Sequence, residues 1–292
     1  MMFLRIIRDA LQRLLKLEEK FDRVQEALGR IESRQLSEIN VKSPADAEYR
    51  VFSQWGEDGI IDWLTTRVPI EREIFIEFGI ENYTEANTRF LLMHRNWSGL
   101  VIDSSEANIR SIKHQEVFWR YKLKAATAFI TRENINGIFR ENNISGDIGL
   151  LSIDIDGNDY WIWKVIDAVS PRIVVIEYNS RLGPDLSVTI PYDADFSRGP
   201  AHYSMIYYGA SLRALWKLGR QKGYQLICCN SAGNNAFFVR EDVMPERLRP
   251  ADVGEVFVRG KFRESRDEDG RLTYLDPGDE ERILAALKWV EV

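Results

Sequence analysis

Short apolar runs alternate with segments of helical length from residue 74 to residue 239, and this alternation limits the possible folds more than any other feature of the sequence. Each run has the length and composition of a buried strand. The runs are Ile74–Glu77, Leu100–Asp103, Lys124–Ile130, Ile148–Ile155, Arg172–Glu177, Tyr224–Cys229 and Asn235–Val239. The helical segments between them are Thr84–His94, Glu106–His114, Asn134–Asn142, Tyr160–Val169 and Leu212–Lys222. Such repeats predict an α/β fold with a doubly wound sheet, and the short link between the last two runs predicts an antiparallel hairpin at one edge.

Residues 1–42 carry a seam of apolar side chains that lie alternately four and three positions apart. The members are Phe3, Ile7, Ala10, Leu14, Leu17, Phe21, Val24, Leu28 and Ile31. A lone helix cannot bury such a seam, so we expect a coiled coil that joins copies of the chain into a homo-oligomer. One alternative is a helix packed on its own globular domain. Another is contact between the basic, leucine-rich first half and a membrane surface.

The rest of the chain divides into an α/β domain over 43–240 and an appendage over 241–292. In the appendage, GEVFVRGKF and RLTYL flank the polar stretch RESRDEDG, which predicts a hairpin. The following DPGDEERILAALKWV predicts a capped helix.

Charge and hydropathy exclude several classes of protein. The chain has 39 Lys+Arg against 45 Asp+Glu, and this net charge of −6 argues against nucleic-acid binding. No run approaches the 18 or so apolar residues that a membrane-spanning helix needs. The apolar N-terminus is interrupted by arginines, unlike a signal peptide, so we expect a cytoplasmic protein.

Acidic residues end the first two expected strands. The first ends in Glu77-Phe78-Gly79 and the second in Asp103-Ser104. Ligands of doubly wound sheets bind at the carboxyl ends of the strands, and an acid after the second strand commonly holds a ribose. We therefore expect these residues in a nucleoside site. The alternative is that Asp103 only caps the following helix.

The loop after Gly79 reads IENYTEANT and lacks the further glycines of a dinucleotide fingerprint. A pyrophosphate needs close backbone approach, and the carboxylates of Glu77, Glu81 and Glu85 would repel it. These features favour a nucleoside without phosphates. S-adenosylmethionine fits, because carboxylates attract its sulfonium and ammonium groups.

Oxygen ligands gather after the fourth and fifth expected strands. They are Asp154, Asp156, Asn158 and Asp159 after the fourth strand, and Glu177 with Asn179 at the end of the fifth. These strand ends should meet at one edge of the sheet, where so many carboxylates cannot all stay charged and unpaired. Mg²⁺ or another divalent cation prefers such ligands. The alternative is that the residues after the fourth strand cap the next helix.

Several stretches together resemble the FkbM-like methyltransferases. They are SQWGEDGII (53–61), FIEFG (75–79), NT (87–88), NWSGLVIDSS (96–105), LLSIDIDGND (150–159) and IVVIEYN (173–179). The resemblance implies a class I methyltransferase fold, S-adenosylmethionine as cofactor, and a hydroxyl of a sugar, glycan or natural product as the methyl acceptor. The cofactor contacts that it implies are Glu77, Gly79 and Asp103, with Ser53 and Gln54 near the methionine end and Thr88 near the first loop.

An acceptor hydroxyl is a weak nucleophile and needs a base or a metal. Metal-dependent O-methyltransferases of this general fold take ligands from strands four and five, which implies Asp154, Glu177 and Asn179 here. Asp156 is an alternative ligand or the base. His202 lies in the loop FSRGPAHYSMIYYGAS and is a second candidate base, although a lone histidine is more often solvated.

Two other functions fit parts of the pattern. Asp154-x-Asp156 after an apolar strand is also typical of metal-dependent glycosyltransferases that bind a sugar nucleotide. A catalytically inactive scaffold, oligomerised by its coiled coil, is favoured by the missing second glycine.

Overall fold

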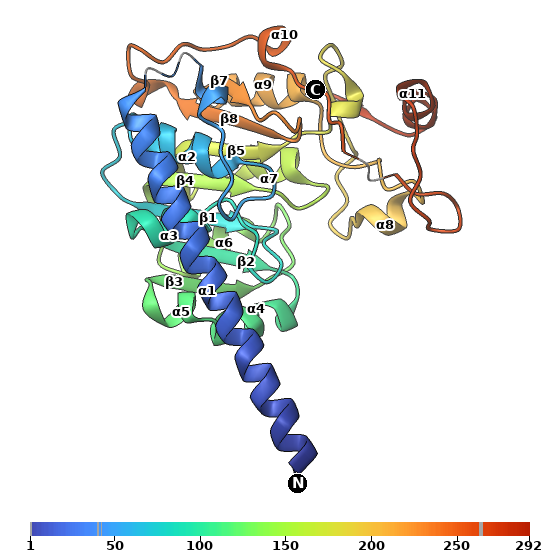
Figure 1. Cartoon of the computed structure of the whole chain (residues 1–292). Coiled ribbons are helices and arrows are strands. Elements are labelled where there is room, and N and C mark those ends of the chain that lie inside the picture. Colours follow the sequence, from blue (N-terminus) through green and yellow to red (C-terminus); the bar gives the residue numbers. More distant parts are fainter. Residues whose placement is uncertain (1, 40, 42, 263–264) are drawn as a thin grey trace.

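The computed structural model describes residues 2–39, 41, 43–262 and 265–292, with side chains described from residue 20 onward in these ranges and at residue 17. Its centre is a seven-stranded sheet of order β3-β2-β1-β4-β5-β8-β7 (Figure 1). The strands are β1 (Ile74–Phe78), β2 (Ser98–Asp103), β3 (Leu123–Thr127), β4 (Gly146–Ile153), β5 (Val169–Glu177), β7 (Tyr224–Cys229) and β8 (Asn235–Arg240). β8 runs antiparallel to β5 and β7, and the other neighbours are parallel. This is the strand order of the class I methyltransferase fold, so the predicted fold class and the antiparallel hairpin at the edge are both confirmed.

Helices cover both faces of the sheet. They are α1 (Met2–Glu38), η1 (Pro44–Ala47), α2 (Glu57–Thr65), α3 (Arg89–Arg95), α4 (Glu106–His114), α5 (Glu116–Arg120), α6 (Ile135–Glu141), α7 (Asp159–Val165), η2 (Ser180–Leu182), α8 (Arg198–Ala201), α9 (Leu212–Gln221), η3 (Glu241–Val243), α10 (Val253–Val256) and α11 (Pro277–Ala285). The helix expected from Thr84 begins only at Arg89, because residues 79–88 form a loop beside the strand ends. None of the described helices is long and apolar enough to cross a membrane.

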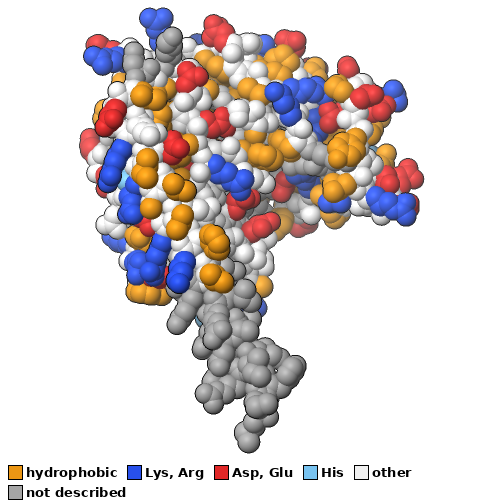
Figure 2. Space-filling view, in the orientation of Figure 1, with side chains coloured by type: hydrophobic (Ala, Val, Ile, Leu, Met, Phe, Trp, Pro, Cys, Tyr) orange, Lys and Arg blue, Asp and Glu red, His pale blue; other side chains and the backbone are white. Residues whose placement is uncertain are grey.

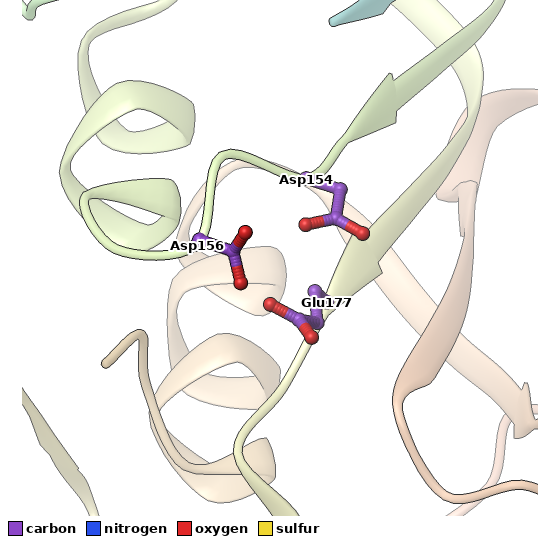
Figure 3. A group of neighbouring side chains, drawn as sticks. All are labelled: Asp154, Asp156 and Glu177. Atoms are coloured by element: carbon purple, nitrogen blue, oxygen red, sulfur yellow. The ribbon is translucent and has the colours of Figure 1, made fainter. Parts of the chain in front are cut away.

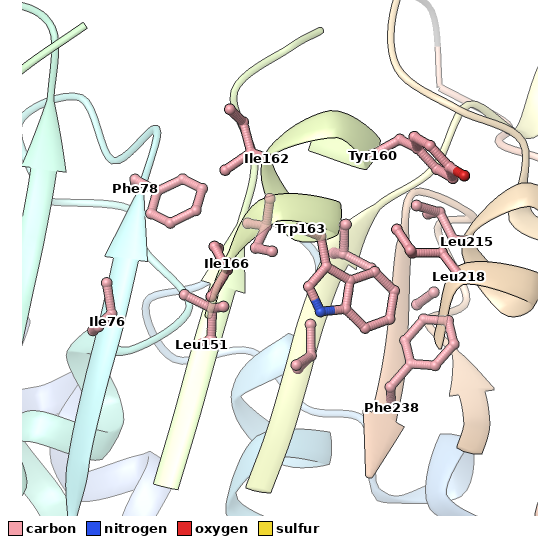
Figure 4. Packing of buried hydrophobic residues seen from close by; sticks show 14 of the residues in the cluster. Ile76, Phe78, Leu151, Tyr160, Ile162, Trp163, Ile166, Leu215, Leu218 and Phe238 are labelled. Atoms are coloured by element: carbon pink, nitrogen blue, oxygen red, sulfur yellow. The ribbon is translucent and has the colours of Figure 1, made fainter. Parts of the chain in front are cut away.

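Side chains of the central strands alternate between two apolar layers. Ile76 and Phe78 of β1 face the layer of α6, α7 and α9, whereas Phe75 faces the layer of α2 and α3. In the first layer Trp163 of α7 is 1% exposed and packs at a tilt against Phe238 of β8, with ring centroids 5.0 Å apart (Figure 4). The sheet is therefore buried on both sides, and its carboxyl edge is the part that remains open to a ligand.

The second half of α1 packs against its own domain through a face that the apolar seam does not include. A Cβ on Gly29 would lie 2.5 Å from a methyl of Val51, so the two backbones approach closely. Leu36 of the helix is buried, and Asp22 of the helix forms an ion pair of 2.6 Å with Arg89. The seam side chains of Phe3, Ile7, Ala10 and Leu14 lie outside the described residues.

The C-terminal segment packs on the domain. In the stretch of the predicted hairpin, the described residues contain α10 and then a short antiparallel turn, in which Arg266 and Leu272 form a bridge and the Asp267 amide donates to the Arg271 carbonyl at 2.9 Å. The predicted capped helix is present as α11, whose N-cap Asp276 accepts a hydrogen bond from the Asp279 amide at 2.9 Å. An added pair, β6 (Val188–Thr189) with β9 (Val290–Glu291), ties the end of the chain to the domain.

Candidate active site

A cavity of about 420 Å³ opens at the carboxyl ends of the strands, beside the point between β1 and β4 where the strand order reverses. Seven carboxylates line it: Glu77, Glu81, Glu85, Asp103, Asp154, Asp156 and Glu177. Arg198 is the single cationic side chain among its described lining residues. An acidic cavity at the switch point suits a cationic ligand better than a phosphate.

Glu77, at the end of β1, holds the loop that follows it. Its Oε1 accepts a hydrogen bond from the Asn87 amide at 2.8 Å, and its Oε2 accepts from the amide and the hydroxyl of Thr88 at 3.0 and 2.5 Å. Burial raises the pKa of Glu77 to about 7. The side chain lines the cavity, but both of its oxygens also fix the start of α3.

Gly79 is required by the neighbouring strand end. Its φ is +77°, and a Cβ there would lie 1.5 Å from the Asp154 carbonyl oxygen. The loop then turns without further glycines, because Glu81 and Tyr83 adopt left-handed conformations with φ of 46° and 64°. Tyr83 is fully buried, and its hydroxyl lies 3.0 Å from that of Thr88. A buried tyrosine thus anchors the loop for which the sequence showed no glycine pattern.

Asp103, at the end of β2, lines the cavity with one oxygen committed to the protein. Oδ1 accepts hydrogen bonds from the Ser105 amide at 2.8 Å and from Asn108 at 3.0 Å. The N-cap of α4 is Ser105, so Asp103 is not the cap considered in the sequence. Among the described residues no hydrogen bond reaches its second oxygen, which leaves Oδ2 for a ligand.

Asp154, Asp156 and Glu177 point toward one another after β4 and β5 (Figure 3). Each offers an oxygen, and these atoms all lie within 4.8 Å of one another. Burial, followed by repulsion from Asp156 and Asp159, raises the pKa of Asp154 well above its ordinary value. Burial and then repulsion from Asp154 do the same to the pKa of Glu177. A group of this kind has the oxygen ligands of a divalent-cation site.

Three buried oxygens of lining residues have no hydrogen-bond partner among the described residues. They are Oε2 of Glu177, Oδ1 of Asn158 and Oδ1 of Asn235. Asn235 of β8 lies directly across from Glu177 of β5 in the sheet register. Buried polar atoms are normally satisfied, so these oxygens call for a cation or a donor in the cavity.

Arg198 places a positive charge beside this acidic group. Its Nη1 lies 2.5 Å from Oδ1 of Asp156, its Nε donates to the Met205 carbonyl at 2.6 Å, and its guanidinium stacks 3.9 Å above the Tyr208 ring. Asp156 itself has a left-handed φ of 54°. The loop carrying Arg198 also packs Phe196 on Gly157, where a Cβ would lie 2.3 Å from the ring.

The structure brings some of the expected residues to the cavity and not others. Those that line it are Gln54, Glu77, Gly79, Asp103, Ser104, Asp154, Asp156 and Glu177. Those outside its lining are Ser53, Phe78, Thr88, Asn179 and His202.

The residues outside the lining have structural partners. The Ser53 hydroxyl accepts from the amides of Gly56 and Asp58 at 3.3 and 3.2 Å, and Phe78 belongs to the apolar core. The Thr88 hydroxyl donates a hydrogen bond to Oε2 of Glu77. Each of them therefore shapes the site indirectly.

Asn179 does not serve as a cavity ligand in this arrangement. Its amide donates to the carbonyls of Ile206 and Tyr208 at 2.9 and 3.1 Å, and its oxygen accepts from the Arg181 amide. Both the nitrogen and the oxygen of this fully buried side chain are therefore bound within the protein, which does not fit the expected role of Asn179 as a metal ligand.

His202 lies away from the acidic group. Its Nδ1 is 2.6 Å from the Ser204 hydroxyl, and its ring lies 4.4 Å from that of Tyr203. Partial burial lowers the pKa of His202. A role as base would require movement of its loop.

The lining residues that the sequence analysis did not single out include Phe129, Phe196, Arg198 and Asn235. Phe129 follows β3 and is 50% exposed. Its position after a strand was the available signal. Arg198 and Phe196 carried no signal, because their loop has no strand or helix pattern.

Comparisons with known proteins are limited to folds. No family model matches the chain, and no curated protein matches it significantly. Among solved structures, the N-terminal domain of EvdMO1 with SAH bound is 11% identical, covers 64% of this chain and 80% of its own, and has a TM-score of 0.42. An O-methyltransferase from Bacillus cereus in complex with SAH is 12% identical, with coverages of 62% and 78% and a TM-score of 0.41. A putative caffeoyl-CoA O-methyltransferase from Staphylococcus aureus is 12% identical, with coverages of 82% and 100% and a TM-score of 0.41.

Proposed function

We propose that this protein is an S-adenosylmethionine-dependent O-methyltransferase that acts on a hydroxyl of a sugar, glycan or natural product. The observation that carries the proposal is the acidic cavity at the switch point of a class I sheet, with Asp103 presenting a free carboxylate oxygen. The FkbM-like motifs of the sequence support the same activity.

The half of the cavity at the carboxyl ends of β1 and β2 would bind the cofactor. The residues fit a cationic nucleoside: Oδ2 of Asp103 can accept from a ribose hydroxyl, and Phe129 offers a half-exposed ring for a base. Glu77, Glu81 and Glu85 attract positive charge, and Gln54 lines the same rim. When bound, the cofactor supplies an electrophilic methyl group.

The acceptor half is the end of β4 and β5. Asp154, Asp156 and Glu177 would hold a divalent cation, and the unpartnered Oε2 of Glu177 fits such a ligand. The chemistry that a cation supplies there is polarisation of the acceptor hydroxyl. Where Asp154 and Glu177 suffice as ligands, Asp156, 57% exposed at its side chain, is instead the base that takes the hydroxyl proton. Arg198 neutralises Asp156 until a ligand displaces it.

Positioning carries most of the expected rate enhancement. The in-line transfer needs the acceptor oxygen and the methyl carbon within about 3–3.5 Å. Gly79 and Asp154 hold the ends of β1 and β4 in direct contact, so the two halves of the cavity keep a fixed separation. The proposal includes a homo-oligomer built through the N-terminal helix.

Ligand-dependent melting tests the activity against its alternatives. At 100 times its dissociation constant, S-adenosylhomocysteine should stabilise the folded chain by about 2.7 kcal/mol. For a chain of this size that is a rise of about 5 °C in Tm. A rise with a UDP-sugar and Mn²⁺ instead would indicate the glycosyltransferase, which Asp154-x-Asp156 favours. No rise with either ligand would indicate an inactive scaffold.

A further inference from the structure

The described part of α1 presents its apolar seam to solvent. Leu17, Phe21, Val24, Leu28 and Ile31 are between 48% and 66% exposed. Figure 2 shows hydrophobic side chains following the outward face of this helix above its undescribed end. A continuous apolar row of this kind marks an interaction surface, whereas single exposed residues do not.

The domain of the same chain cannot cover this seam. The opposite face of α1 is fixed by Gly29, Ser33 and Leu36, which are buried or in close contact with the domain. The ion pair of 2.6 Å between Asp22 and Arg89 also holds this face on the domain, and Arg89 is 5% exposed. Turning the helix to bury the seam would expose Leu36 and leave Arg89 buried without its acid, which is strongly unfavourable.

Charges on the two edges of the seam differ in sign. With Phe21 and Leu28 at heptad position a, and Leu17, Val24 and Ile31 at position d, the flanking positions follow from the sequence. The g edge carries Arg13, Lys20, Ala27 and Arg34, and the e edge carries Glu18, Gln25 and Glu32. In a parallel pair each g edge faces the partner's e edge, whereas in an antiparallel pair like edges meet.

We propose that a second copy of this chain covers the seam in a parallel, in-register coiled coil, with the basic edge of each helix against the acidic edge of the other. This inference rests on the homo-oligomer in the proposed function and adds its surface, its orientation and its register. A membrane surface is the weaker occupant. Helices that lie on membranes have a wide apolar face and basic flanks, but this seam is narrow and one flank carries Glu18 and Glu32.

Light scattering of the full chain tests the surface. The wild type should have at least twice the monomer mass. Leu28→Glu should reduce it to the monomer while the circular dichroism and Tm of the domain stay unchanged, because Leu28 is 57% exposed. The matched control is Leu272→Glu, the same exchange at a side chain that is 56% exposed outside α1, and it should keep the oligomer. A monomeric wild type, or an oligomer that survives Leu28→Glu, overturns the proposal.

Disulfide trapping tests the orientation separately. Ile31→Cys should give a covalent dimer on air oxidation, because equal d positions face each other only in a parallel, in-register pair. The two natural cysteines are buried and unpaired, so they should not contribute. Arg23→Cys, on the flank of the helix away from the seam, is the control and should cross-link poorly.

The outcomes distinguish a wrong helix orientation from a missing homo-oligomer and from a missing methyltransferase activity. An oligomer without the Ile31→Cys cross-link keeps self-association and overturns the parallel register. A monomer that sediments with phosphatidylserine vesicles, and loses this binding in Leu28→Glu, assigns the seam to a membrane surface instead. Loss of the oligomer leaves S-adenosylhomocysteine binding unaffected in either case.

Discussion

The two halves of the cavity rim are both acidic, but their carboxylates differ in how many hydrogen bonds they accept from the protein. At the end of β1 and β2, Glu77 has both oxygens in hydrogen bonds and Asp103 has one. At the end of β4 and β5, Asp154 and Glu177 stand beside each other with raised pKa values, and Glu177 keeps a buried oxygen without a partner among the described residues. The carboxylates of the first half are largely satisfied by the protein, whereas those of the second half leave an oxygen for a ligand.

This difference in hydrogen bonding suits the two halves of the rim to different ligands. Satisfied carboxylates hold a loop rigid and present a fixed surface, which suits the binding of a cofactor in one position. Crowded carboxylates gain most from a ligand that neutralises them, which suits a metal and the acceptor that it polarises.

Removal of the cation should have the largest effect if the second half is a metal centre. EDTA, or Asp154→Asn, should lower turnover by about 100-fold or more, because the acceptor hydroxyl then loses its activation. Methyl transfer measured with a labelled cofactor checks this. Asp195→Asn, an exposed acid of the neighbouring loop, should leave turnover unchanged. Full activity in chelator would show that the three carboxylates serve another purpose.

Asp103→Ala should weaken cofactor binding by about tenfold, because it removes a charged hydrogen-bond acceptor from the ribose. Calorimetry with S-adenosylhomocysteine measures the affinity. The control is Glu106→Ala at the exposed start of α4, which lies outside the cavity lining and should bind normally. Equal affinities for the wild type and Asp103→Ala would contradict the ribose assignment.

The sequence predicted the strands and their ends well, because buried strands of a doubly wound sheet read as apolar runs. Glu77, Asp103, Asp154 and Glu177 reach the cavity for that reason: each sits where an apolar run stops. Side-chain partners within the loops could not be read from the pattern. Asn179 follows a strand just as Glu177 does, yet its amide is taken up by carbonyls some 30 residues away.

The loop after β1 shows a second limit. Its missing glycines argued for an unusual conformation, but no pattern in the sequence predicts that Tyr83 is buried in a left-handed conformation and anchors the loop. Arg198 is the larger omission. It begins the one-turn helix α8, which no sequence pattern predicts, and only the tertiary fold brings it to Asp156.

Arg198→Met should tighten Mn²⁺ binding by about fivefold. In the wild type a cation must displace the guanidinium from Asp156, but that carboxylate is 57% exposed at its side chain, so solvent screening limits the pair to about 1 kcal/mol. Electron paramagnetic resonance of free Mn²⁺ measures the change. Arg213→Met, which removes a partly buried arginine paired with Asp185 at 3.7 Å outside the cavity lining, is the control. Weaker binding in Arg198→Met would show that Arg198 supports the site.

The smallest expected effect concerns pH and the half of the rim at the ends of β1 and β2. Burial raises the pKa of Glu77 to about 7 from an ordinary value of 4.5, so the folded state holds this proton more tightly than the unfolded state. The free energy of unfolding should therefore fall as pH rises from about 4.5 to about 7. Urea titrations of the wild type should show this decline, to which Asp58 and Asp159, each with a pKa raised to about 6, also contribute. Glu77→Gln should be less stable but should decline less steeply over the same range; an equal slope would mean that the Thr88 and Asn87 hydrogen bonds keep Glu77 ionised throughout.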